Sequence, residues 1–156
     1  MKRLVKMVGL MVGICLLLPG IANAVGSCTQ QFADISDTGM RTVTLSCTGH
    51  ATGGSFPAIT IREQVFGMVL VADVNPGATA PTANYDITLT NTDGIDLFGS
   101  ALTNRSATVS ERTLPLRDGV YSAMVSDGTL VLNITGNSVN SATTVIKITW
   151  LQMEGR

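Results

Sequence analysis

A strict alternation of apolar and small polar residues recurs along this chain, and it constrains the fold more than any other feature. Residues 41–47 show it most clearly, because Val, Leu and Cys occupy every second position and Thr or Ser occupies the positions between them. A repeat of two residues places one kind of side chain on each face of an extended strand. No stretch after residue 24 keeps a helical repeat over a comparable length. The pattern therefore predicts an all-β protein.

The alternating segments are separated by residues that favour turns. The expected strands are 41–47, 58–62, 67–74, 84–90, 95–98, 106–114, 121–125, 129–135 and 143–151. The run at 67–74 is apolar apart from one Asp, which is typical of a central strand buried on both faces. The segment 106–114 is expected near a sheet edge, because Pro115 follows it. Turns are expected where Asn or Asp precedes Gly, at 91–94, 118–119 and 127–128.

Eight or nine short strands without a crossover helix favour an antiparallel β-sandwich or a jelly-roll-like fold. We therefore predict a single domain of about eight strands over residues 25–156. A chain of this length can bury about two-thirds of its unfolded surface in one core. No linker-like composition divides it.

The first 24 residues have the features of a signal peptide. Lys2, Arg3 and Lys6 supply a positive start, an apolar run covers 8–18, and residues 22–24 give the Ala-Asn-Ala pattern that precedes a cleavage site. The apolar run is shorter than the roughly 20 residues that span a bilayer. We expect residues 1–24 to be removed during export. An uncleaved N-terminal anchor is the alternative.

The charge balance argues against nucleic acid as a partner. The chain has 10 Lys and Arg and 11 Asp and Glu, and three of the basic residues but no acidic residue lie in 1–24. Residues 25–156 thus carry 7 basic and 11 acidic side chains, a net charge of −4. A weakly acidic surface without a basic cluster has little attraction for a phosphate backbone. Contact with a membrane is expected only during export.

Two cysteines remain after residue 24, and an even number fits an oxidising compartment. Cys28 and Cys47 are expected to form a disulfide that closes a loop of about 20 residues and stabilises the fold by about 3 kcal/mol. Two alternatives stay open. Residues 25–28 loosely resemble a lipobox, in which case Cys28 would be acylated. The pair could also be two buried free thiols.

Few residues are available for catalysis. The one histidine, His50, follows Cys47 in a Gly-rich loop, and a Ser-His-Asp arrangement would need a buried acid to position it. No serine stands in a Gly-x-Ser-x-Gly elbow. One histidine and two paired cysteines do not make a conventional zinc site. We predict no enzyme activity, no metal site and no cofactor.

Residues 91–96 and Trp150 each allow two interpretations. The oxygen-bearing side chains of 91–96 suggest a calcium loop, but Leu102 stands where an EF-hand needs its bidentate acid. A turn with a left-handed glycine is the favoured interpretation. Trp150 lies in an expected strand, where it could anchor an interface. The favoured role is to fill the core, the commoner use of a tryptophan.

Four segments resemble a family of small tailed-bacteriophage structural proteins. They are residues 75–90 (NPGATAPTANYDITLT), 93–99 (DGIDLFG), 101–105 (ALTNR) and 130–143 (LVLNITGNSVNSAT). These are strand and turn motifs, so the resemblance implies a β-rich particle component made in copies, with no catalytic residues to transfer. It also implies a place in the virion.

The leading hypothesis is a non-enzymatic structural or assembly subunit of a virus-like particle or of a cell-surface structure. It would associate with itself as a homo-oligomer, or with other particle or surface proteins, through sheet edges and flat faces. The alternative is a secreted or periplasmic binding module that contacts carbohydrate or protein through the loops at 49–55 and 100–104. A small hydrolase that uses His50 is a third hypothesis. The expected location is periplasmic, extracellular or on the cell surface, or the virion if the resemblance holds.

Overall fold

The computed structural model describes residues 25–35 and 37–153, so the predicted signal peptide at 1–24 lies outside the described residues. Within this part the chain forms eleven strands and no helix: β1 (Ser27–Ile35), β2 (Met40–Thr48), β3 (Ile59–Thr60), β4 (Val65–Pro76), β5 (Asp86–Thr90), β6 (Glu111–Thr113), β7 (Leu116–Arg117), β8 (Val120–Tyr121), β9 (Met124–Gly128), β10 (Val131–Thr135) and β11 (Thr143–Gln152). The predicted all-β class is confirmed. The strands outnumber the eight expected because three of them are only two residues long. Among the described residues there is accordingly no helix that could cross a membrane.

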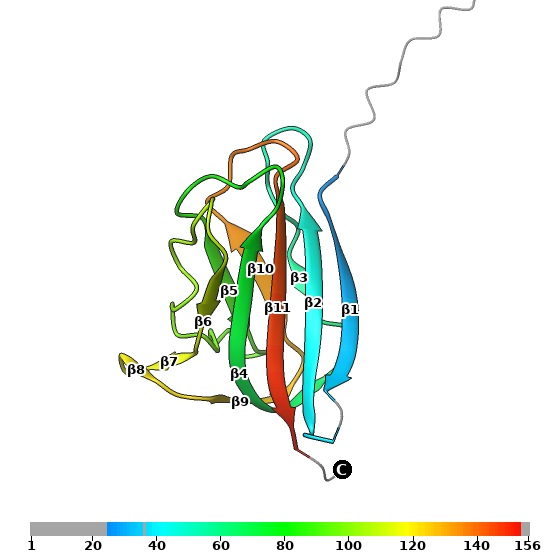
Figure 1. The fold of residues 1–156 in the computed structure, drawn as a ribbon, viewed down its shortest axis with the longest axis vertical. Coiled ribbons are helices and arrows are strands. Elements are labelled where there is room, and N and C mark those ends of the chain that lie inside the picture. Colours follow the sequence, from blue (N-terminus) through cyan, green and yellow to red (C-terminus); the bar gives the residue numbers. More distant parts are fainter. Residues whose placement is uncertain (1–24, 36, 154–156) are drawn as a thin grey trace, which may run out of the picture.

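The strands build two antiparallel sheets that pack as a sandwich (Figure 1). The large sheet has the order β1-β2-β11-β4-β6. β11 occupies one edge of β4, and β6 and β9 share the other edge. The small sheet has the order β3-β10-β5, and β7 and β8 form a separate hairpin that projects from the sandwich. The predicted antiparallel sandwich is confirmed.

One hydrophobic core lies between the two sheets. The large sheet contributes side chains such as Leu45 and Ile146, and the small sheet contributes side chains such as Leu89 and Leu132, all fully buried. Trp150 is also fully buried, and its Nε1 donates a hydrogen bond of 2.9 Å to Oε1 of Gln152. The predicted core role of Trp150 is confirmed.

β1 is a strand that the sequence pattern does not reveal. Its inward side chains Cys28, Gln30 and Phe32 are only half-buried, because β1 is the outermost strand of the large sheet. A polar residue at an inward position removes the alternation that identifies a strand. β1 instead owes its conformation to pairing with β2 along its whole length, from Ser27 opposite Thr48 onward.

The prediction of a strand at 95–98 is wrong. Asp96 forms an isolated bridge with Thr90, and Leu97 and Phe98 belong to a turn. The cause is the carboxylate of Asp96, which accepts hydrogen bonds from the backbone N–H groups of Phe98 (3.1 Å) and Ser100 (2.8 Å). An Asp side chain that bonds to nearby backbone groups bends the chain away from a sheet ladder. Leu97 and Phe98 are still buried, so their apolar character reflects the core rather than a strand.

The two Asp-Gly pairs have different structures. Residues 118–119 form the predicted hairpin turn between β7 and β8, with positive φ at both residues (50° and 79°) as the favoured two-residue turn requires. The prediction of a turn at 127–128 is wrong, because both residues belong to β9 and pair with β4. The chain crosses from the large sheet to the small sheet directly afterwards, at the fully buried Leu130.

β4 is central in the large sheet, as expected, but it is not buried on both faces. Its inward residues Val69, Ala72 and Val74 are buried, whereas Met68 and Leu70 on the outer face stay half-exposed. The outer face is the side turned away from the small sheet. Within residues 25–35 and 37–153, no second layer of strands packs over it.

Candidate interaction surface

An unbroken row of apolar side chains crosses the outer face of the large sheet. Backbone pairing places Ile35 of β1 opposite Met40 of β2, Met40 opposite Leu151 of β11, Leu151 opposite Met68 of β4, and Met68 opposite Val125 of β9. Side chains that lie directly opposite on neighbouring strands touch one another. Five strands therefore present one continuous apolar row, which lies at the end of the sheet where β1 meets β2 (Figure 1).

These side chains point outward because their neighbours in sequence fill the core. Trp150 precedes Leu151 and is buried on the inner face, and Val69 follows Met68 in the same way. Ile35 is 39% exposed and Val125 is 63% exposed at the two ends of the row. Interior positions of a strand alternate between faces, so the same register that builds the core creates the row.

Two further apolar residues extend the patch on the side away from the disulfide, one within β4 and one directly after β11. Phe66 is 44% exposed and Met153 is 49% exposed. The N–H of Met153 donates a hydrogen bond of 3.1 Å to the carbonyl of Phe66, which keeps the two residues side by side. We call the seven residues together the apolar patch: Ile35, Met40, Phe66, Met68, Val125, Leu151 and Met153.

Gly67 fixes the backbone within the patch. Its φ is +152°, and a Cβ there would collide with the carbonyl oxygen of Leu151. Only glycine therefore allows β4 and β11 to approach this closely between Phe66 and Met68.

The rest of the outer face is polar. Arg112 of β6 donates hydrogen bonds of 2.6 Å and 2.9 Å to the two carboxylate oxygens of Asp73, and Lys147 of β11 lies opposite Asp73. The hydrogen bond from Arg112 lowers the pKa of Asp73. These three charges form a cluster with a net charge of +1. On β11 it lies two rows from the apolar row, because Thr149 separates Lys147 from Leu151 on the outer face.

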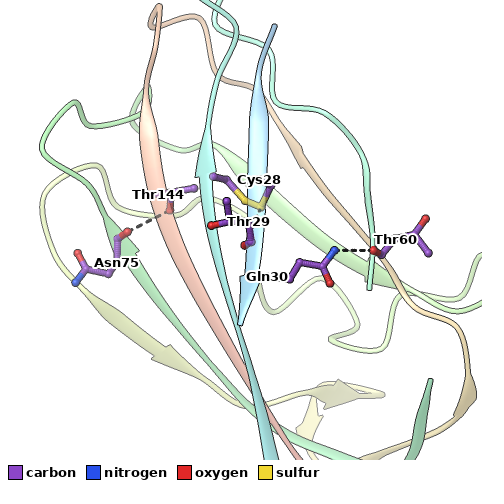
Figure 2. Close-up of a disulfide and its surroundings, with 7 residues drawn as sticks. Cys28, Thr29, Gln30, Thr60, Asn75 and Thr144 are labelled. Carbon is purple, nitrogen blue, oxygen red and sulfur yellow. Dashed lines mark hydrogen bonds between the residues drawn. A yellow bond between two sulfur atoms is a disulfide. The ribbon is translucent and has the colours of Figure 1, made fainter. Parts of the chain in front are cut away.

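The disulfide lies toward the opposite end of the sheet. Cys28 and Cys47 face each other across β1 and β2 and are bonded, with 2.04 Å between the sulfur atoms (Figure 2). Nearby, the hydroxyl of Thr144 donates to the carbonyl of Asn75 over 3.2 Å and lies 3.2 Å from the hydroxyl of Tyr85. Burial raises the pKa of Tyr85.

The carboxamide of Gln30 joins the two sheets along the β1 side. Its Nε2 donates a hydrogen bond of 2.8 Å to the carbonyl of Thr60 in β3 (Figure 2). Its Oε1 accepts a hydrogen bond of 3.0 Å from the N–H of Arg62. One side chain thus supplies both a donor and an acceptor to the neighbouring segment.

His50 contributes to the structure of its own loop. Its N–H donates to the carbonyl of Ser55 over 2.8 Å, and the N–H of Thr52 donates to its Nδ1 over 3.0 Å. The loop at 49–55 is tied to a second loop, since the N–H of Gly53 donates to the side chain of Asn140 over 2.8 Å. His50 therefore acts as a turn-forming residue here.

The oxygens of residues 91–96 accept hydrogen bonds from the backbone. Oδ1 of Asn91 accepts from the N–H groups of Asp93 (3.1 Å) and Ile95 (2.9 Å), and Gly94 has the left-handed φ of 78°. The favoured turn interpretation is confirmed. In the described part of the chain, no group of three or more His, Cys, Asp or Glu residues could hold a metal ion.

The loop at 100–104 packs against the start of β5. The N–H of Ile87 donates to the carbonyl of Leu102 over 3.0 Å, and the N–H of Asn104 donates to a carboxylate oxygen of Asp86 over 2.8 Å. Leu102 is fully buried. The buried Leu102 thus anchors this loop to the core, whereas hydrogen bonds hold the loop at 49–55 in place.

A depression of about 390 Å³ adjoins the apolar patch beside the turn between β1 and β2, and it is lined by Asp34, Ile35, Asp37, Gly39, Met40, Arg41 and Gln152. Arg41 binds Asp34 (2.5 Å) and Glu63 (2.8 Å), and its guanidinium lies 5.8 Å from the ring centre of Trp150. The hydrogen bond to Asp34 raises the pKa of Arg41. The cation is therefore held by the fold, which leaves the apolar patch as the main feature of this end.

No family model matches the chain, and no curated protein matches it. A solved structure described as "Cyanophage Pam1 capsid asymmetric unit" is similar at 12% sequence identity and a TM-score of 0.42, over 97% of this chain and 94% of that chain. A likeness at this level assigns neither a family nor a function.

Proposed function

We propose that this chain is a non-enzymatic structural subunit that assembles, with copies of itself or with other particle or surface proteins, through the apolar patch. The observation that carries the proposal is the row of five apolar side chains across five strands. Contiguous exposed apolar surface on a folded domain marks an interaction site. The strand and turn motifs at 75–105 support a place in a phage-like particle.

The proposal includes export, with residues 25–156 as the mature domain. It is supported by the basic start, the short apolar run and the Ala-Asn-Ala pattern of residues 1–24. The mass of the protein recovered from its producing cell tests this part. A polypeptide that begins at Val25 supports it, and one that keeps Met1 contradicts it.

The assembly is tested by sedimentation velocity over a range of micromolar concentrations. The unaltered protein should associate, and Met68→Glu should weaken the association at least ten-fold, because a carboxylate inside the row would be desolvated on contact. Ser46→Glu is the matched control, since residue 46 lies on the same face of β2, opposite Val145 and nearer the disulfide than the row of Lys147.

The control should associate as the unaltered protein does. An unaltered protein that stays monomeric at every concentration would contradict the proposal. So would equal weakening by Met68→Glu and Ser46→Glu, because the apolar patch would then have no special part in assembly.

A further inference from the structure

The outer face of the large sheet is organised in rows of residues that lie opposite one another on neighbouring strands. Beside the apolar row, toward the disulfide, lies a row of smaller side chains formed by Ala33, Thr42, Thr149 and Val71. The next row holds Lys147, Asp73 and Arg112. On the other side of the apolar row, Phe66 lies opposite Asp127.

From this layout we infer that the apolar patch pairs two copies of this chain face to face, about a two-fold axis that crosses the strands. The inference rests on the proposed function and adds the partner and its orientation. The axis lies between the apolar row and the row of smaller side chains. The apolar row of each copy therefore lies over the row of smaller side chains of the other copy. Leu151 then packs over Thr149 of the second copy, and Met68 packs over Val71 of the second copy.

The available area fits such a pair. Five strands about 4.8 Å apart and four rows about 6.7 Å apart give a face of roughly 650 Å². Stable interfaces bury roughly 600–1,000 Å² on each partner. The four rows run from Phe66 to Asp73 on β4, so the polar residues nearest the disulfide lie outside the contact. Two sheets whose strands run within about 30° of antiparallel pack in the same way as the layers of a sandwich.

The charges on the face select this axis over the other possible one. A two-fold axis parallel to the strands would run along β11, the middle strand, and would place Lys147 directly on Lys147 of the second copy. Like charges in a desolvated contact oppose association. An axis across the strands keeps these two ammonium groups on opposite sides of it.

The same axis brings opposite charges together. Asp127 of β9 and Arg112 of β6 both pair with β4 on the side away from β11. Asp127 lies one row from the apolar row, on the side away from the disulfide. Arg112 lies two rows from the apolar row, on the disulfide side. The axis exchanges these two rows, so Asp127 of each copy meets Arg112 of the other. Asp127 has no ion-pair partner among the described residues, and the side chain of Arg112 is 72% exposed.

The orientation is tested by pulsed electron paramagnetic resonance on the V145C variant carrying one nitroxide per chain. Position 145 lies on the outer face of β11, one row beyond Lys147. The two native cysteines of residues 25–156 are joined in the disulfide, so the mature domain takes the label only at position 145. The inferred pairing places the two labelled positions about 35 Å apart, and the parallel axis places them about 10 Å apart.

A distance distribution centred near 35 Å supports the inference. A distribution centred below about 20 Å overturns it and leaves the proposed function standing, because the protein would still assemble. A protein that sediments only as a monomer removes both. The three results are therefore distinguishable.

Charge variants give a second, independent test in the full-length associating protein. Asp127→Lys should raise the dimer dissociation constant at least ten-fold, since it would place two cations together. The double variant Asp127→Lys/Arg112→Glu should recover part of that loss. Asp118→Lys on the exposed hairpin turn is the control and should leave the constant unchanged. Equal effects of the lysine at 127 and at 118 would overturn the inference.

Discussion

The two ends of the large sheet differ in how they use the same strands. At one end, a disulfide joins β1 to β2, and the outer face carries Thr29 and Ser46. At the other end, the described strands have no covalent link, and the outer face carries the apolar patch. Both ends have equally buried inner faces, with Ile146 and Trp150 fully covered.

Under the proposed function, the difference separates the residues that stabilise the fold from the residues that mediate assembly. Core packing holds both ends of the sandwich together, so the apolar outer side chains at one end are not needed to close the core. Their position on the outer face contributes little to folding, since they remain half-exposed. Removing interactions at the disulfide end should therefore change the free energy of unfolding, whereas changes in the apolar patch should change association.

The largest effect is expected from removal of the disulfide. The Cys28→Ala/Cys47→Ala variant should lose about 3 kcal/mol of stability, because a closed loop of about 20 residues restricts the unfolded chain. Urea unfolding measures the loss. Association per folded molecule should stay unchanged in sedimentation, since the patch lies at the other end. A folded variant that associates more weakly than the unaltered protein at the same denaturant concentration would contradict the assignment of stability to one end of the sheet and of association to the other.

A smaller effect is expected at Tyr85. Tyr85→Phe should cost about 1 kcal/mol by removing the hydrogen bond to Thr144. Thr144 keeps its bond to the carbonyl of Asn75, so no buried hydroxyl is left unpaired. Burial raises the pKa of Tyr85 in the folded protein. The stability that depends on its neutral form is therefore complete below the ordinary pKa of about 10 and is lost as the pH rises further.

The alkaline branch of the stability curve tests this account. Unfolding of the unaltered protein should become easier above about pH 10 with a slope that is absent or reduced in Tyr85→Phe. Identical slopes for the two proteins would show that Tyr85 is not the titrating group.

The smallest effect is expected at the border between the two ends. Asp73→Asn should lower stability near neutral pH by no more than about 1 kcal/mol, because the pair with Arg112 is largely at the surface. The pKa of Asp73 is lowered in the folded protein, so its contribution is present above the ordinary Asp pKa of about 3.9 and is lost as the pH falls further. The difference between the two proteins in urea midpoint should therefore disappear in acid. A difference that persists unchanged at low pH would assign the effect to packing.

Alternation predicts the strands that lie in the middle of each sheet. The expected segments 41–47 and 143–151 fall within β2 and β11, which have pairing partners on both sides. It fails at β1, where an inward Gln replaces an apolar residue, and at 95–98, where Asp96 satisfies backbone amides instead of a ladder. Local patterns report burial, and at these positions burial and strand geometry do not coincide.

The apolar patch could not be predicted from the sequence for a different reason. Ile35, Met40 and Leu151 lie far apart in the chain, and only the cross-strand register brings them into one row. Register depends on pairing between distant segments, which no local pattern encodes. The one available signal was the apolar run of β4, whose outer residues were expected to be covered.

The amide bridge made by Gln30 also bears on how copies can join. Outermost strands are the usual place where a second chain adds its own strand and starts a fibril. Here the side chain of Gln30 holds Thr60 and Arg62 beside β1 through hydrogen bonds of 2.8 Å and 3.0 Å. A neighbouring segment held beside an outermost strand is one of the ways in which folded proteins obstruct growth by strand addition.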